Sequence, residues 1–116
     1  ELPMEWGASR QEGEVGGTAD TDTVFAALTV RSRRVLLAEL ADASGQASAV
    51  ELAHRLVVSG VGPAGSQEAY LELYHTHGPV LERAGLLEWD RSTGEMWLTE
   101  AGREAVEILE HLTASE

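Results

Sequence analysis

Apolar residues recur at helical spacing along most of the chain after residue 20, which indicates a series of amphipathic helices. A first helical segment is predicted to run to Asp42, with a bend near residues 30–32, where helix propensity falls. Its start offers three N-cap residues, Thr21, Asp22 and Thr23. Its predicted apolar face consists of Val24, Phe25, Leu28, Val35, Leu36 and Leu40.

A second, shorter helix is predicted from Ala49 to Leu56 or Val57. Ser48 and Glu51 have the spacing of a capping box, in which a hydroxyl and a carboxylate satisfy two amides at a helix start. The inward face is predicted to carry Leu52, Ala53 and Leu56. A glycine-rich loop over residues 59–66 follows.

The third helix is predicted over about residues 67–84. One side carries an apolar set with a histidine in it: Tyr70, Leu73, Tyr74, His77 and Leu81. Pro79 lies inside this helix and removes a backbone hydrogen bond, which predicts a kink or a restart of the helix there. Gly85 can adopt the left-handed conformation that ends a helix.

Two short apolar segments follow, and the turn residues 91–94 between them predict a β-hairpin over about residues 86–99. Thr99 is the expected cap of a final helix that runs from Glu100 to about Thr113. The predicted order is helix, helix, helix, strand, strand, helix. This is a mostly α fold with a small antiparallel β-hairpin, of the α+β class.

The length of 116 residues supports one domain. Residues 1–19 are glycine-rich and acidic, which predicts a flexible N-terminal tail, with Met4 and Trp6 as its exceptions. The folded domain is expected to cover residues 20–116.

The net charge is −12, from 20 acidic and 8 basic residues, and every basic residue is arginine. A non-specific nucleic-acid binder normally has the opposite sign of charge. The acidity fits adaptation to molar salt, in which repulsion between carboxylates is screened within about 3 Å. It also fits mimicry of nucleic acid or docking to a basic partner. The scattering of the carboxylates along the chain favours salt adaptation.

The sequence contains no cysteine, which excludes disulfides and thiolate chemistry. It shows no membrane-spanning stretch and no secretory signal, so a cytoplasmic protein without membrane contact is expected. We find no nucleophile elbow and no phosphate-binding loop, and therefore expect no catalytic residues and no cofactor. His75 and His77 are two positions apart, so on a helix they diverge, and no metal site is expected. His77 fits a hydrogen-bonded core residue.

Three segments resemble small winged-helix regulators. Residues 27–40 are similar to the first helix of the ArsR-like class, residues 81–87 to the end of its recognition helix, and residues 98–103 to the segment after its wing. Together with Tyr74-His75-Thr76-His77-Gly78-Pro79, the combination resembles an uncharacterised haloarchaeal winged-helix family. The resemblance implies a winged helix-turn-helix fold and a DNA-binding transcriptional regulator from a salt-adapted cytoplasm.

In that arrangement the exposed side of the third helix enters the major groove of double-stranded DNA. The candidate DNA-contacting residues, from this helix and the wing, are Glu72, His75, Thr76, Pro79, Arg83, Arg91 and Thr93. Two alternatives stay open. The helix face can be solvated without a role, or the domain can be a protein-interaction module that has lost DNA binding. A cluster of three arginines, Arg31, Arg33 and Arg34, fits ion pairs with acidic residues at the rim of the core, and contact with a phosphate is the alternative for one of them.

The final helix carries an apolar stripe that also includes Ala101 and is flanked by Val106. The stripe is wider than one small domain needs to cover, so a homodimer is predicted. The candidate dimer contacts are Ala105, Ile108, Leu109 and Leu112. The alternative is that this helix packs only against the first helix of its own chain.

Overall fold

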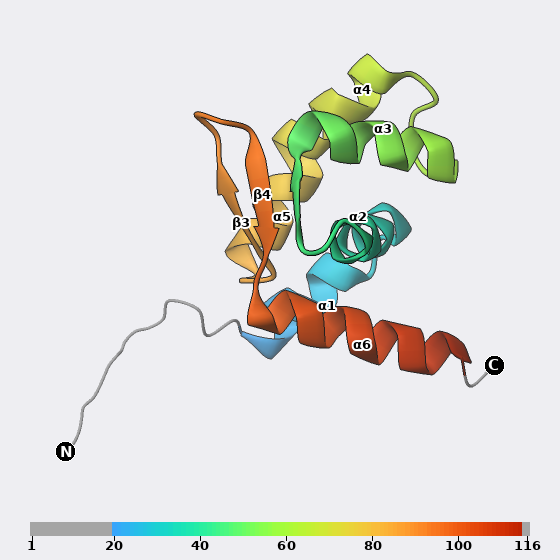
Figure 1. Cartoon of the computed structure of the whole chain (residues 1–116). Coiled ribbons are helices and arrows are strands. Elements are labelled where there is room, and N and C mark those ends of the chain that lie inside the picture. The colour runs from blue at the N-terminus through green and yellow to red at the C-terminus, as the bar shows by residue number, and fades with distance from the viewer. Residues whose placement is uncertain (1–19, 115–116) are drawn as a thin grey trace.

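The computed structural model describes residues 20–114 and shows a mostly helical fold with a small antiparallel sheet (Figure 1). The α+β class is therefore confirmed. The predicted tail, with Met4 and Trp6, and the last two residues lie outside the described part. The elements, in chain order, are α1 (Thr21–Leu28), α2 (Arg31–Asp42), β2 (Gln46–Ser48), α3 (Ala49–Ser59), α4 (Ser66–Glu72), the π-helical turn η1 (Leu73–His77), α5 (Gly78–Arg83), β3 (Leu87–Asp90), β4 (Glu95–Leu98) and α6 (Glu100–Ala114).

The first predicted helical segment is two helices, which separate at Thr29 and Val30. The predicted N-caps are wrong by one residue, because the side chain of Asp20 accepts the hydrogen bond from the Thr23 backbone N–H. Phe25 was expected on the buried face but is 65% exposed. The break redirects the chain, so the helical phase of α2 does not extend back to Phe25.

The second helix begins as predicted, with the Ser48 hydroxyl accepting from the Glu51 N–H at 3.1 Å. The Glu51 carboxylate does not complete the capping box and binds Arg55 instead. Leu52, Ala53 and Leu56 are buried as expected. The helix runs two residues beyond Val57 and ends at Gly60, which adopts the left-handed conformation.

The sheet contains one strand that the sequence pattern did not predict. β2 pairs antiparallel with β4, and β4 pairs antiparallel with β3, which gives the strand order β2-β4-β3. Ala47 and Trp89 both lie opposite Met96. β2 has only three residues, so it shows no period of its own and needs β4 to define it.

The third helix is continuous in direction but changes its winding before Pro79. In η1 the Gly78 N–H donates to the Leu73 carbonyl, five residues back, which is the π-helical pattern. The prediction that the helix restarts at Pro79 is confirmed within one residue, since α5 begins at Gly78. The chain then turns at Gly85, with φ 78°, and enters the predicted hairpin.

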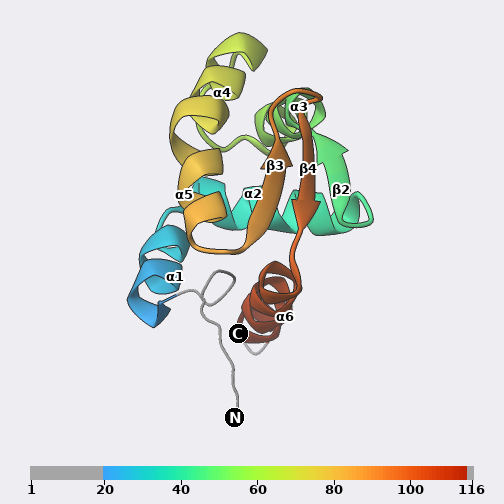
Figure 2. The same ribbon diagram turned by 90° about the vertical axis from the view of Figure 1, so that its left-hand side faces the viewer.

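α6 begins as predicted, with the Thr99 hydroxyl accepting from the Gly102 N–H at 3.0 Å. Its first turn lies against the segment before β3, so closely that a Cβ at residue 102 would overlap the Leu86 carbonyl. α6 then crosses α2, and its last turns extend away from the sheet (Figures 1 and 2). The core, between α2, α3, α5 and the sheet, is aliphatic around Leu36, Leu40, Leu52, Leu73, Leu81 and Met96.

Candidate nucleic-acid interface

The candidate face consists of the exposed side of α4, η1 and α5 together with the turn that joins β3 to β4. Figure 2 shows α4 and α5 as one column with the hairpin beside it. His75, Thr76, Arg83, Arg91 and Thr93 are exposed. The structure therefore leaves five of the seven predicted residues accessible.

The other two predicted residues, Glu72 and Pro79, are both half-buried. The Glu72 carboxylate is directed along the helix to His77, with Oε1 3.2 Å from Nε2. His77 is 6% exposed, so the expectation of a hydrogen-bonded core histidine is confirmed. Its Nδ1 atom is buried without a hydrogen-bond partner among the described residues. Glu72 is therefore engaged with a buried histidine, while its own side chain stays 42% exposed.

Arg91 lies in the hairpin turn and has two partners within its own chain. Its guanidinium pairs with the Glu82 carboxylate of α5, with the shorter contact at 3.0 Å. It also lies 4.0 Å above the ring centroid of Trp89, within cation–π range. These contacts join the turn to the third helix, and the Glu82 carboxylate partly offsets the charge of Arg91.

The turn itself is held by short-range hydrogen bonds. The Ser92 hydroxyl donates to Asp90 Oδ1 at 2.6 Å, and the Ser92 N–H donates to the same atom at 2.9 Å. The Ser92 hydroxyl and then the Ser92 N–H hold the pKa of Asp90 below its ordinary value. The Thr93 hydroxyl accepts from the Glu95 N–H, and Gly94 supplies a φ of 84°. The turn therefore presents a fixed shape.

Close packing between the helix and the hairpin depends on a glycine that the sequence pattern did not single out. Gly78 lies against the Trp89 indole, and Tyr74 meets the same ring edge-on at a centroid distance of 5.1 Å. In the sequence, Gly78 draws attention only as part of the segment Tyr74-His75-Thr76-His77-Gly78-Pro79. Its lack of a side chain matters because β3 packs Trp89 directly against it.

The candidate face is acidic as a whole. Residues 66–95 contain six carboxylates and two arginines. Glu72 and Glu82 are engaged with His77 and Arg91, while Glu68 and Glu88 are exposed. Arg83 is exposed and forms no hydrogen bond or ion pair with any residue that the structure describes. It is the one cation of this segment whose charge is not offset by a direct contact there.

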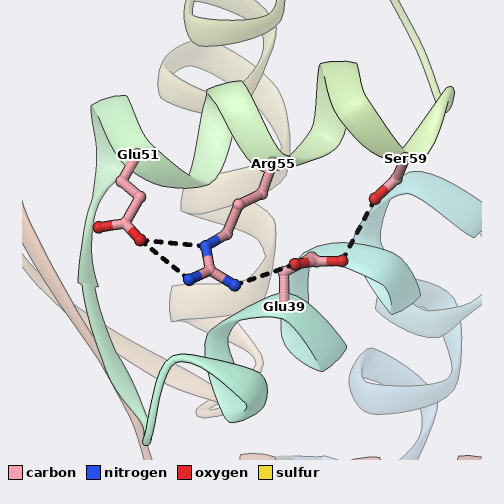
Figure 3. A network of polar contacts seen from close by, with 4 residues as sticks. All are labelled: Glu39, Glu51, Arg55 and Ser59. Atoms are coloured by element: carbon pink, nitrogen blue, oxygen red, sulfur yellow. Dashed lines mark hydrogen bonds and ion pairs between the residues drawn. The ribbon is translucent and has the colours of Figure 1, made fainter.

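Arg55 connects the helices behind this face (Figure 3). From α3 it binds Glu51 one turn earlier and Glu39 of α2, at 3.0 and 3.2 Å. Ser59 donates to the second oxygen of Glu39. The hydrogen bonds to Glu51 and then to Glu39 raise the pKa of Arg55 above its ordinary value. The network fixes α3 on α2, and α3 in turn packs against α4.

The expected ion pairs of the Arg31–Arg33–Arg34 cluster do not form within the described residues. Arg34 donates to the Leu28 carbonyl at 2.7 Å. Arg33 buries its Nε without a partner, and Arg31 is exposed. The expectation of rim ion pairs with acidic residues is therefore wrong for this part of the chain.

The candidate dimer residues fall into two groups. Ala105 is 8% exposed and Leu109 is half-buried, so both contact their own chain. Ile108 and Leu112 are 59% and 58% exposed.

Within residues 20–114 there is no group of three or more side chains able to hold a metal ion. No helix in that range is long and apolar enough to cross a membrane.

The fold and the face together define a small mostly helical α+β domain in which one helix and one hairpin share an exposed surface. The chain belongs to the family described as a domain of unknown function (DUF7344), whose model matches residues 25–97. The match runs from α1 to β4 and includes the whole candidate face. Comparison with curated proteins and with solved structures gave no significant match.

Proposed function

We propose that this chain is a winged helix-turn-helix protein that binds double-stranded DNA and regulates transcription in a salt-adapted cytoplasm. The observation that carries the proposal is the topology. Helix α2, strand β2, helix α3, the α4–α5 helix and the β3–β4 hairpin follow one another, and the strand order is β2-β4-β3. In this arrangement α3 and α4–α5 form the helix-turn-helix, and the hairpin forms the wing beside the recognition helix.

The exposed side chains of the α4–α5 helix supply contacts suited to a duplex. An α-helix fits the major groove, where His75 and Thr76 can hydrogen-bond to base edges. Arg83, unpaired among the described residues, is available for a phosphate. Arg91 can reach the backbone from the wing by exchanging Glu82 for a phosphate, at the cost of its present ion pair.

The acidity of the face sets the conditions under which such binding would operate. Exposed Glu68 and Glu88 repel phosphates at low ionic strength. At molar salt this repulsion decays within about 3 Å, so that direct hydrogen bonds decide the affinity. A salt-adapted regulator of this kind should bind through a few close contacts rather than through a broad positive field.

The test is fluorescence anisotropy with a labelled pool of genomic duplexes, in KCl from about 0.1 M to the molar range. Wild-type protein is compared with Arg83→Ala and with Arg103→Ala, which removes the same charge from the exposed surface of α6. We expect Arg83→Ala to weaken binding and Arg103→Ala to bind like wild type. Absence of binding to any duplex over the whole KCl range would refute the proposal.

A protein-interaction module is the second candidate, and one observation favours it. An apolar depression between α3 and α4 is lined by Val50, Ala53 and Tyr70, and Val50 is 68% exposed. Its wall also carries four polar residues, Glu51, His54, Ser66 and Gln67, and Glu51 is paired with Arg55. An apolar depression suits the apolar side of an amphipathic segment of another protein better than a phosphate backbone. Val50→Asp would abolish such an interaction.

A further inference from the structure

A groove of about 580 Å³ lies between α2 and α6, on a different side of the molecule from the candidate DNA face. Each helix contributes residues at helical spacing. Val35 and Ala38 of α2 face Val106 and Leu109 of α6, so the floor of the groove is apolar. Both walls are helices, and a groove of this form accommodates the apolar side of another helix.

The lip of the groove on the α2 side is positively charged. Arg31 and Arg34 line it, in the first turn of α2. This turn contains no acidic residue, and the N-cap residue, Val30, provides no side-chain hydrogen bond. Neither arginine pairs with a carboxylate among the described residues. Glu110 of α6 also lines the groove, but it forms no ion pair with either arginine. Both guanidinium groups can therefore pair with a carboxylate of another molecule.

The outer side of α6 has the complementary chemistry. Ile108 and Leu112 are four residues apart, so they form one exposed apolar stripe. Glu104 lies one turn before Ile108, and Glu107 lies next to Ile108 on the acidic side of the helix; both are exposed. Val106 and Leu109 face the groove instead, so stripe and groove occupy different sides of the same helix. One copy therefore presents both halves of a self-complementary contact.

We propose that this groove seats α6 of a second copy of the chain, and that the second copy receives α6 of the first in the same way. Ile108 and Leu112 of each copy would cover the apolar floor of the other. Glu104 and Glu107 would face Arg31 and Arg34. The contact is isologous, which closes a two-fold dimer. The dimer contact uses a surface distinct from the third helix and the hairpin, so dimerisation can be tested independently of DNA binding.

The test measures association by sedimentation equilibrium of the full chain, in the lowest KCl at which the protein stays folded, so that charge effects remain visible. The wild type should dimerise, and Ile108→Glu should be monomeric. Arg31→Glu should weaken the dimer roughly tenfold, because each ion pair occurs twice. A glutamate in the first turn of α2 favours the helix, so loss of association would not reflect unfolding. Arg83→Glu, with the same change in charge on α5, should leave the dimer intact.

A charge exchange makes the assignment specific. Glu104→Arg should weaken the homodimer as Arg31→Glu does, whereas a mixture of the two variants should form a heterodimer with both contacts complementary. A monomeric wild type at about millimolar concentration would overturn the proposal and leave residues 1–19 or a small anion as the occupant. A dimer insensitive to both charge reversals would overturn the assignment to this groove.

Discussion

Gly78 of α5 lies so close to Trp89 of β3 that a methyl group at residue 78 would come within 2.5 Å of the indole Cζ3 atom. The contact joins the third helix to the hairpin, and Tyr74 and Arg91 pack on the same indole. The relative position of the helix and the hairpin, and therefore the shape of the candidate face, depends on the missing side chain at this position.

We predict that Gly78→Ala lowers the free energy of unfolding by about 1–3 kcal/mol, the usual cost of overpacking a filled site. The better helix propensity of alanine, worth about 1 kcal/mol, offsets only part of it. Urea unfolding measures the change. Trp89→Leu should relieve the contact with the indole but not the 2.9 Å approach to the Leu73 carbonyl, so the Gly78→Ala penalty should be smaller, though not abolished, in that background. A Gly78→Ala protein as stable as the wild type would show that the helix and the hairpin are not in close contact.

Stability should rise with salt. Residues 20–114 contain 15 acidic side chains and three ion pairs between arginine and carboxylate, so most carboxylates of this part of the chain are not paired with an arginine. Their repulsion destabilises the folded state at low ionic strength and is screened as KCl increases. Thermal melts should therefore show a Tm that increases with KCl. Sucrose is the uncharged control, because it stabilises folded proteins by exclusion from their surface and does not screen charge. A Tm that is flat or falls with KCl would remove the argument for salt adaptation.

Two further substitutions on the candidate face should change DNA binding without unfolding the domain. Arg91→Ala should reduce affinity for all duplexes and lower the salt slope by about 1, as expected for a phosphate contact. His75→Ala should change the preference among sequences, because His75 is exposed on the helix and positioned for base edges. Binding of the variants to a panel of duplexes measures both effects. Equal losses on every sequence for His75→Ala would contradict its assignment to base readout.

The hairpin turn should contribute a pH-dependent increment of stability. The pKa of Asp90 is lowered in the folded state, so the folded chain holds the proton less tightly than the unfolded chain does. The contribution is therefore complete above the unfolded pKa, near about 4, and is lost as the pH falls through the lower folded value. Asp90→Asn should lower the Tm at pH 7 and have little effect at about pH 2. A difference that persists unchanged at acid pH would contradict this account.

Helix and hairpin boundaries followed closely from the sequence. Ser48 and Thr99 accept the capping hydrogen bonds predicted for them, and Gly85 adopts the predicted left-handed conformation. These features depend on a few adjacent residues, and hydroxyl caps and glycine turns act over one turn of the chain. β2 was missed for the opposite reason, since it exists only through its pairing with β4.

The sequence by itself determined which segments are helical, which hydroxyl groups cap two of the helices and that two strands form a hairpin, because these properties depend on local periodicity and backbone preference. The tertiary structure decided which side chains remain accessible. Arg91, a candidate DNA-contacting residue of the hairpin turn, pairs with Glu82 of α5, nine residues earlier. Such pairings, like the approach of Gly78 to Trp89, arise from the packing of separate elements, and the periodicity of one segment contains no information about the segment placed against it.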